Sequence, residues 1–206
     1  MAKRTVEESS LTAVADAIRD RTGTSEPLVF PDGFVSAVEG IPDYSTALID
    51  RSIEEIENNL VTDIGTYAFQ SCSKLAKASF PNATKVNGSA FSGCSALVDV
   101  NLPKMLSTAN NAFQGCGFSK FDCPSFWYIA GSTFKLCSNL TALVLRVDRL
   151  ATLVSTNCLE STPIASGTGY IYVPRSLVDS YKSATNWSTY ANQIRAIEDY
   201  PDITGG

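Results

Sequence analysis

A nine-residue motif returns at nearly constant spacing through the middle of the chain, and this repetition limits the available folds more than any other feature. The motif occupies residues 64–72, 86–94, 108–116 and 129–137, and each copy ends in Phe-x-x-Cys. A degenerate fifth copy keeps Cys158 but has Ser155 in place of the phenylalanine, so that successive cysteines lie 22, 22, 21 and 21 residues apart. A unit of this length cannot bury its own apolar face, so neighbouring units must stack and share one core. The sequence therefore predicts a solenoid.

Each copy is followed by a short segment of alternating residues, which is typical of a β-strand with an inward and an outward face. Proline shortly after all but one of these segments ends the strand. We predict an α/β-type repeat solenoid of about five coils, with repeats over residues 64–174. An internal phenylalanine column should comprise Phe69, Phe91, Phe113 and Phe134. The paired outward strand positions are Lys77 and Ser79, Asp99 and Asn101, Lys120 and Asp122, Ala142 and Val144, and Tyr170 and Tyr172.

The periodic cysteines are interpreted as small apolar core residues. Metal sites group their ligands, commonly as Cys-x-x-Cys pairs, whereas one cysteine occurs per repeat here. Equivalent positions in stacked coils point the same way, which does not suit disulfide geometry. Cys123 falls at an inward strand position and joins this set. We therefore expect neither a metal nor another cofactor.

The absence of histidine argues against ordinary hydrolase or metalloenzyme chemistry, because histidine is the commonest general base and metal ligand. No nucleotide-binding or hydrolase motif is present either, and we predict a protein without enzymatic activity. The net charge is −5 and no basic stripe occurs, so neither nucleic acid nor membrane is an expected partner. No apolar run approaches the roughly 18 residues of a membrane span. The charged N-terminus is not typical of a signal peptide, and we expect folding in the cytosol with reduced thiols.

Capping elements are expected at both ends, because a solenoid exposes its core there. Helical spacing of Ile49, Ile53, Ile56 and Leu60 predicts an N-terminal helical cap that begins near Ser45 or Thr46. Residues 175–198 are expected to form a C-terminal cap of two short helices, broken at residues 186–188 and anchored by Trp187. The capped solenoid would span residues 45–200. Residues 1–41 form a separate segment with two short amphipathic helices, which are too small for a core of their own.

The pattern Ile-Gly-x-x-Ala-Phe-x-x-Cys-x-x-Leu, followed by Phe-Pro or Leu-Pro, resembles the BspA-like leucine-rich repeats of bacterial surface and phage-encoded proteins over residues 47–200. Ser155, Arg146 and a residue missing after Cys116 depart from it. Residues 11–41 resemble a segment at the front of phage and prophage tail-associated structural proteins.

Together the resemblances imply a virion protein assembled in the host cytoplasm, with residues 1–41 attaching it to other virion subunits. The solenoid would then face the host surface or a neighbouring subunit. The alternatives are a bacterial cell-surface adhesin and a purely structural subunit that forms homo-oligomers.

Candidate contact residues for a protein or glycan ligand come from two sets of positions. The first set is the outward strand column, in which Lys77, Asp99, Asn101, Lys120 and Asp122 give way to Tyr170 and Tyr172 toward the C-terminus. Either this column binds a ligand, or the C-terminal helices fold back over its apolar end. The second set is Trp127 and Tyr128, which replace Thr84 and Lys85 of the first coil. They would form a binding patch, or Trp127 would fill the gap left by the residue missing after Cys116.

Overall fold

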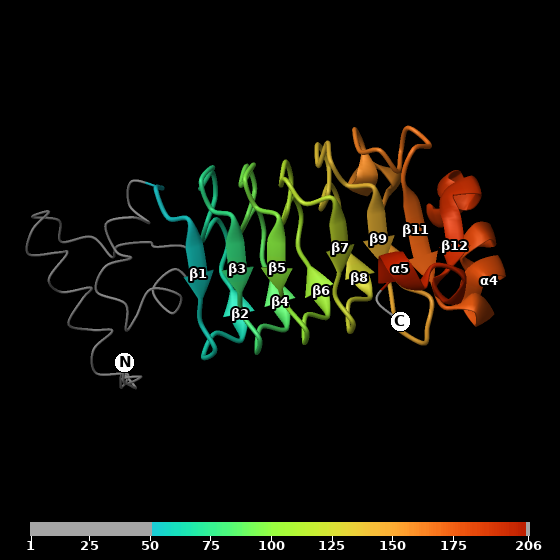
Figure 1. Cartoon of the computed structure of the whole chain (residues 1–206), viewed down its shortest axis with the longest axis horizontal. Coiled ribbons are helices and arrows are strands. Elements are labelled where there is room, and N and C mark those ends of the chain that lie inside the picture. Colours follow the sequence, from blue (N-terminus) through green and yellow to red (C-terminus); the bar gives the residue numbers. More distant parts are fainter. Residues whose placement is uncertain (1–50, 205–206) are drawn as a thin grey trace, which may run out of the picture.

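The computed structural model describes residues 51–204, in which parallel strands are stacked in two rows along an elongated solenoid (Figure 1). The long-strand row consists of β1 (Glu55–Glu57), β3 (Lys77–Ser79) and β5 (Asp99–Asn101) in one sheet, and β7 (Lys120–Asp122), β9 (Ala142–Val144), β11 (Tyr170–Val173) and β12 (Ile194–Ala196) in another. The short-strand row is a single sheet of β2 (Asp63–Ile64), β4 (Lys85–Val86), β6 (Ser107–Thr108), β8 (Tyr128–Ile129) and β10 (Thr152–Leu153). From β1 to β10 each coil thus contributes one strand to each row, whereas β11 and β12 extend the long-strand row alone.

The predicted phenylalanine column runs along the interior between the two rows. Phe69, Phe91, Phe113 and Phe134 are each 0% exposed. Their rings stack with centroid separations of 5.1, 5.4 and 6.0 Å and interplanar angles of 9°, 2° and 5°. Strand register explains the stacking, because each coil repeats the backbone path of its neighbour, as in the pairing of Ala78 with Val100. The prediction that equivalent side chains form continuous columns is confirmed.

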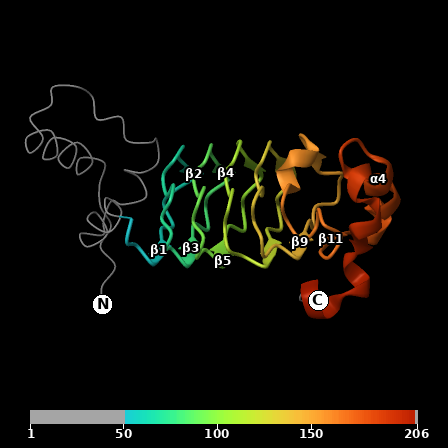
Figure 2. The ribbon, with the colours of Figure 1, turned by 90° about the horizontal axis from the view of Figure 1, so that it is seen from above.

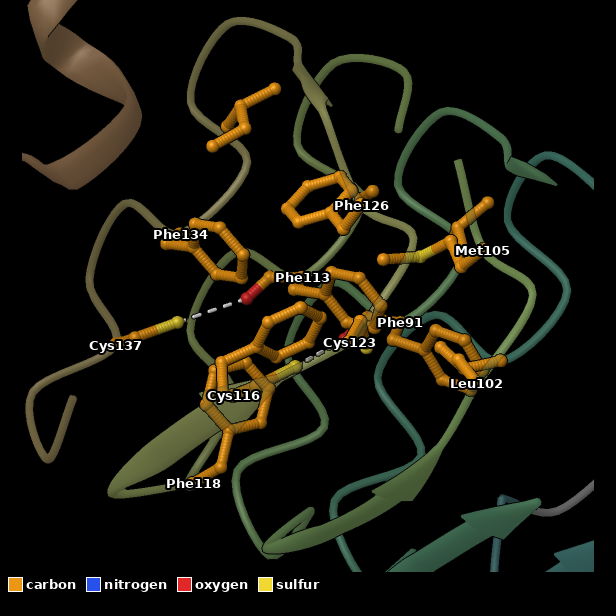
Figure 3. Close-up of a cluster of buried hydrophobic side chains, with 14 of the residues drawn as sticks. Phe91, Leu102, Met105, Phe113, Cys116, Phe118, Cys123, Phe126, Phe134 and Cys137 are labelled. Atoms are coloured by element: carbon orange, nitrogen blue, oxygen red, sulfur yellow. Dashed lines mark hydrogen bonds between the residues drawn. The ribbon is translucent and has the colours of Figure 1, made fainter. Parts of the chain in front are cut away.

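A cysteine column lies beside the phenylalanines (Figure 3). The thiols of Cys94, Cys116 and Cys137 donate to the carbonyl oxygens of Phe69, Phe91 and Phe113, at 3.0, 3.2 and 3.1 Å. All six cysteines are buried and free. Burial raises the pKa of the Cys72 thiol to about 11 and that of Cys137 to about 12. The column therefore consists of protonated thiols that are packed as small apolar groups.

The fifth coil has a different register from the one that its cysteine suggests. In the regular coils the N–H of each phenylalanine donates to the carbonyl of the residue just before the phenylalanine of the next coil, as Phe69 does to Ala90. The N–H of Phe134 correspondingly donates to the carbonyl of Cys158. Leu159, which is fully buried at the end of the 3-10 helix η1 (Thr156–Leu159), therefore takes the phenylalanine position. The prediction that Ser155 occupies the phenylalanine position is wrong. The step from Phe113 to Phe134 is 21 residues, but the step from Phe134 to Leu159 is 25, because the fifth coil is longer.

The predicted N-terminal helical cap is wrong over the residues that the structure describes. Ile53 and Ile56 are each 2% exposed and belong to a further coil, in which β1 pairs Ile56 with Ala78. Leu60, which the helical spacing places on the same face, is 68% exposed. A step of three residues fits a helix, but it also joins two inward positions of a coil. The rest of this cap, residues 45–50, and the helices expected in residues 1–41 lie outside the described residues.

The C-terminal cap agrees with the prediction in its first half only. The helix α4 (Val178–Ser183) follows the 3-10 helix η2 (Arg175–Leu177), and Asn186 breaks the chain with a φ of 66°. The second half forms the 3-10 helix η3 (Trp187–Gln193) and then β12, since Ile194 pairs with Ile171 and extends the long-strand row.

Trp187 is 1% exposed, and its indole N–H donates to the carbonyl of Ala151 at 2.7 Å. It anchors the cap on the last short strand. No helix within residues 51–204 has the length and apolar character that a membrane crossing requires.

Candidate interaction surfaces

The outward positions on β3, β5 and β7 form a polar surface whose side chains mainly contact one another. Lys77 pairs with Glu55 at 3.1 Å, and both side chains are more than half exposed. The amide of Asn101 donates to the hydroxyl of Ser79 at 3.0 Å. Asp99 is exposed beside them. This part of the predicted candidate surface is accessible, but its charges are scattered and partly paired within the chain.

The polar surface ends at β7 and β9 in an ion pair between neighbouring coils. The Nε and Nη2 atoms of Arg146 donate to the two carboxylate oxygens of Asp122, at 2.9 and 2.8 Å. This bidentate contact raises the pKa of Arg146. Lys120 lies 4.0 Å from the same carboxylate. Arg146, which the sequence shows only as a departure from the repeat, therefore joins two coils.

The outward positions become apolar on β9 and β11, and residues 197–204 cover them. We call these residues the strap; they form the 3-10 helix η4 (Ile197–Asp199) and the helix α5 (Pro201–Thr204), which fold back onto the long-strand row (Figure 2). Beneath the strap, Ala142, Val144 and Tyr172 form a second apolar cluster with Ile197.

Tyr172 is only 2% exposed, so the prediction that it is an accessible contact residue is wrong. Its burial raises its pKa, and the ring of Tyr200 lies edge-on to it with centroids 5.4 Å apart. Tyr170 stays 36% exposed, with the guanidinium carbon of Arg195 lying 4.6 Å from its ring centroid. Of the two readings of this column, the structure shows the one in which the C-terminal segment folds back over the apolar end.

Trp127 and Tyr128 lie on the short-strand row, away from the other candidate residues. Tyr128 begins β8 and is 36% exposed, whereas Trp127 is half-buried and packs against the core. Their rings meet edge-on with centroids 5.8 Å apart. The guanidinium carbon of Arg149 lies 4.2 Å from the centroid of Trp127, in cation–π geometry. Leu106 on the neighbouring coil and Leu150 are 41% and 40% exposed. We call Leu106, Trp127, Tyr128, Arg149 and Leu150 the aromatic patch.

The shortened third coil closes at Gly117 and Phe118, in the other part of the coil from Trp127. A Cβ atom added at Gly117 would lie 2.2 Å from the carbonyl oxygen of Ser95, so only glycine fits there. Phe118 is fully buried, with its ring centroid 5.2 Å from that of Phe121. Both the packing and the surface roles of Trp127 remain compatible with its half-buried position.

The aromatic patch owes its cation and one of its leucines to an insertion that the sequence reading missed. From Asp122 to Tyr128 the chain takes 6 residues, but from Val144 to Thr152, at equivalent positions, it takes 8. The longer connection carries Arg149 and Leu150. Aligning all coils on their strands would reveal this insertion, whereas aligning them on cysteine hides it.

A shallow groove of about 520 Å³ adjoins the aromatic patch. Residues 150–154 line one side and residues 184–187 the other. The amide of Asn186 crosses this region and donates to the carbonyl of Leu153 at 2.7 Å, which satisfies the edge of β10. Within the described part of the chain, no group of three or more metal-ligating side chains gathers. The groove offers apolar contacts, since cap side chains already donate to the carbonyls of Ala151, Leu153 and Val154.

Comparison with known families agrees with the repeat architecture. Residues 46–184 match a family described as a BspA type leucine rich repeat region, in six copies. A leucine-rich repeat protein of T. pallidum is 22% identical with a TM-score of 0.45, over 55% of this chain and 52% of that one. A leucine-rich repeat protein of Bacteroides ovatus is also 22% identical, with a TM-score of 0.38, over 60% of this chain and 40% of that one. The chain thus spans about half or less of these structures, and no curated protein matches it.

Proposed function

Because the chain belongs to the BspA-type leucine-rich repeat family, we propose that it is a non-catalytic recognition module whose aromatic patch binds a protein partner. The observation that carries the proposal is the exposure of Tyr128 and Leu106 beside Trp127 and Arg149. Tryptophan, tyrosine and arginine are the residues that most often dominate protein interfaces. The equivalent positions of the first coil hold Thr84 and Lys85, so that the repeat itself does not require aromatic residues there.

A protein ligand fits this patch better than a glycan does. Arg149 lies over the Trp127 ring, at 4.2 Å, and thereby occupies a face on which a sugar would stack. The same arrangement presents an exposed cation beside apolar groups, and such a cation suits a carboxylate or a backbone carbonyl of a partner protein. Insertions in repeat proteins commonly fall on the binding face. The insertion that carries Arg149 and Leu150 is consistent with this rule.

A photocrosslinking side chain at position 128 tests the patch, with the same side chain at position 85 as the matched control on β4. We expect position 128 to capture a partner that position 85 does not capture. In direct titrations of that partner, Tyr128→Ser should weaken binding by about 30-fold, as for a residue worth about 2 kcal/mol at an interface. Lys85→Ser should leave the affinity unchanged. Equal capture at both positions, or capture of glycan alone, would contradict the proposal.

We further propose that the module is part of a phage or prophage virion, with residues 1–41 as the attachment segment; this rests on the resemblance of that segment alone. The alternative is display on a bacterial cell surface as an adhesin. Mass spectrometry of purified phage particles and of cell-wall fractions separates the two. Detection in particles supports the virion location, and detection only in walls of cells without particles supports the adhesin.

A further inference from the structure

We propose that the outer side of β9 and β11 is a docking face for an acidic peptide segment of a partner protein, and that the strap occupies this face as an internal ligand until such a segment displaces it. The face lies on the long-strand row, whereas the aromatic patch lies on the short-strand row. The two surfaces can therefore be tested independently.

The floor of the docking face is apolar where a repeat strand is ordinarily polar. On β3 the outward positions hold Lys77 and Ser79, and on β9 they hold Ala142 and Val144. Val144 is fully buried, although it lies on the opposite side of the sheet from the phenylalanine column. The strap shields this cluster, because Ile197 packs against it and the ring of Tyr200 lies edge-on to that of Tyr172. A face of this composition needs an occupant.

The rim of the docking face is basic, and the strap is acidic. Lys120, Arg146, Arg175 and Arg195 lie beside the apolar floor and the strap, and Asp122, which pairs with Arg146, is the carboxylate among them. The strap carries Glu198, Asp199 and Asp202 in eight residues. Arg175 pairs with Asp199, and its backbone N–H donates to the carboxylate of Glu198 at 3.1 Å. Because the whole chain has a net charge of −5, this basic rim is a local feature that favours an acidic occupant.

The polar contacts that hold the strap lie at the surface. The side chains of the Arg175–Asp199 pair are 59% and 52% exposed, so that solvent screens the pair. Lys120 donates to the carbonyl of Ile203 at 3.1 Å at the surface. Tyr200 and Ile203 are 36% and 37% exposed. A segment with this pattern opens by local unfolding more readily than the coils do.

The test uses the full chain and a fluorescent peptide with the sequence of residues 197–204. The double variant Tyr200→Ser/Ile203→Ser loosens the strap, and Leu60→Ser/Val98→Ser is the control that alters two residues exposed elsewhere. We expect the loosened chain to bind the peptide at least ~10-fold more tightly than the wild type or the control does, because the wild-type strap competes at a high effective concentration. Lys120→Gln in the loosened background should weaken binding, as should added salt. A peptide with serine in place of its tyrosine and isoleucines should not bind.

Hydrogen exchange at the amides of Tyr200 and Ile203 reports the state of the strap, since they donate to the carbonyls of Ile197 and Tyr200. Loss of protection in the loosened variant together with peptide binding supports the proposal. Loss of protection without peptide binding overturns it. Retained protection also overturns it, because the strap would then be a fixed part of the cap. Self-association of the loosened chain in place of peptide binding would assign the face to a second copy and overturn the partner-segment proposal.

Discussion

Replacing Phe113 by alanine should destabilise the chain more than almost any other single truncation. The Phe113 ring is 0% exposed and stacks between those of Phe91 and Phe134, at centroid distances of 5.4 and 6.0 Å. It also meets the ring of Phe121 at 5.1 Å. Phe→Ala changes in cores cost about 3–5 kcal/mol, and aromatic neighbours add about 0.5–1.5 kcal/mol to a buried ring. We expect a loss near the top of that range, about 4–5 kcal/mol.

The magnitude depends on how little the coils can collapse into the space left by the ring. The N–H of Phe113 donates to the carbonyl of Thr133 at 3.0 Å, and the N–H of Phe91 donates to that of Ala112 at 2.8 Å. These bonds fix the spacing of three consecutive coils, so that the cavity stays open. Phe113→Leu keeps most of the volume and should cost about 1–2 kcal/mol.

Urea unfolding followed by far-ultraviolet circular dichroism measures the change, with Val98→Ala as the control because Val98 is 60% exposed. The control should shift the free energy of unfolding by less than about 0.5 kcal/mol. If Phe113→Ala loses less than about 2 kcal/mol at an unchanged m-value, the column does not hold the coils together, and the physical account of the fold given above is wrong.

Two further predictions concern the backbone and the thiols. Leu136 has a φ of 64° and is 50% exposed, whereas glycines, Gly93 and Gly115, hold the equivalent turn positions of earlier coils. Leu136→Gly should therefore stabilise the chain by about 0.5–1 kcal/mol in the same urea assay. Gly115→Ala should destabilise it by about 1–2 kcal/mol. The melting temperature should be nearly constant between about pH 6 and 8 and should fall above about pH 8.5. Above that pH the thiols of the unfolded chain lose their protons, whereas burial raises the pKa of Cys72 to about 11 and that of Cys137 to about 12 in the folded chain. A group whose pKa is raised in the folded state contributes stability that is complete below the pKa of the unfolded state and is lost as the pH rises. An increase in the melting temperature between about pH 9 and 10 would contradict this prediction.

The sequence predicts the interior of the solenoid well because each coil repeats the same inward positions. Phe69, Phe91, Phe113 and Phe134 follow directly from the motif, as does the strand pairing of Lys77 with Asp99. The same reasoning fails at the two ends. Ile53 and Ile56 fit both a helix and a coil, and burial against the next coil decides between them. Ile194 likewise pairs with β11 instead of continuing a helix.

The fifth coil shows why a single matched residue is a poor anchor for a register. Cys158 lies at the spacing of the other cysteines, yet its thiol donates to the carbonyl of Ala130 at 3.0 Å and it takes the alanine position before Leu159. Inserted residues between Val144 and Leu159 shift the frame. Local residue identity cannot reveal such a shift, because leucine replaces phenylalanine at little cost in a coil covered by the cap.

The candidate contact residues were predictable where they depend on strand alternation and not where they depend on loops or termini. Tyr170 is partly exposed, as the alternation predicts, and Tyr128 is exposed at a position where the first coil holds Lys85. Tyr172 also points outward, but the strap covers it, and no periodicity in the sequence indicates that residues 197–204 return to β11. The contact of Arg149 with Trp127 arises from the length of one connection.

The two proposed surfaces coincide with departures from the repeat, and this coincidence has a physical reason. In a regular coil the outward side chains satisfy one another, as Lys77 does with Glu55 and Asn101 with Ser79. Binding of a partner to a regular surface of this kind would gain little free energy, because its charges are solvated and partly paired within the chain. From Trp127 onward the chain breaks the pattern with tryptophan, tyrosine, valine and leucine at outward positions, and these side chains gain from desolvation. Recognition in this chain should therefore be concentrated toward its C-terminal coils, with the N-terminal coils acting as a spacer.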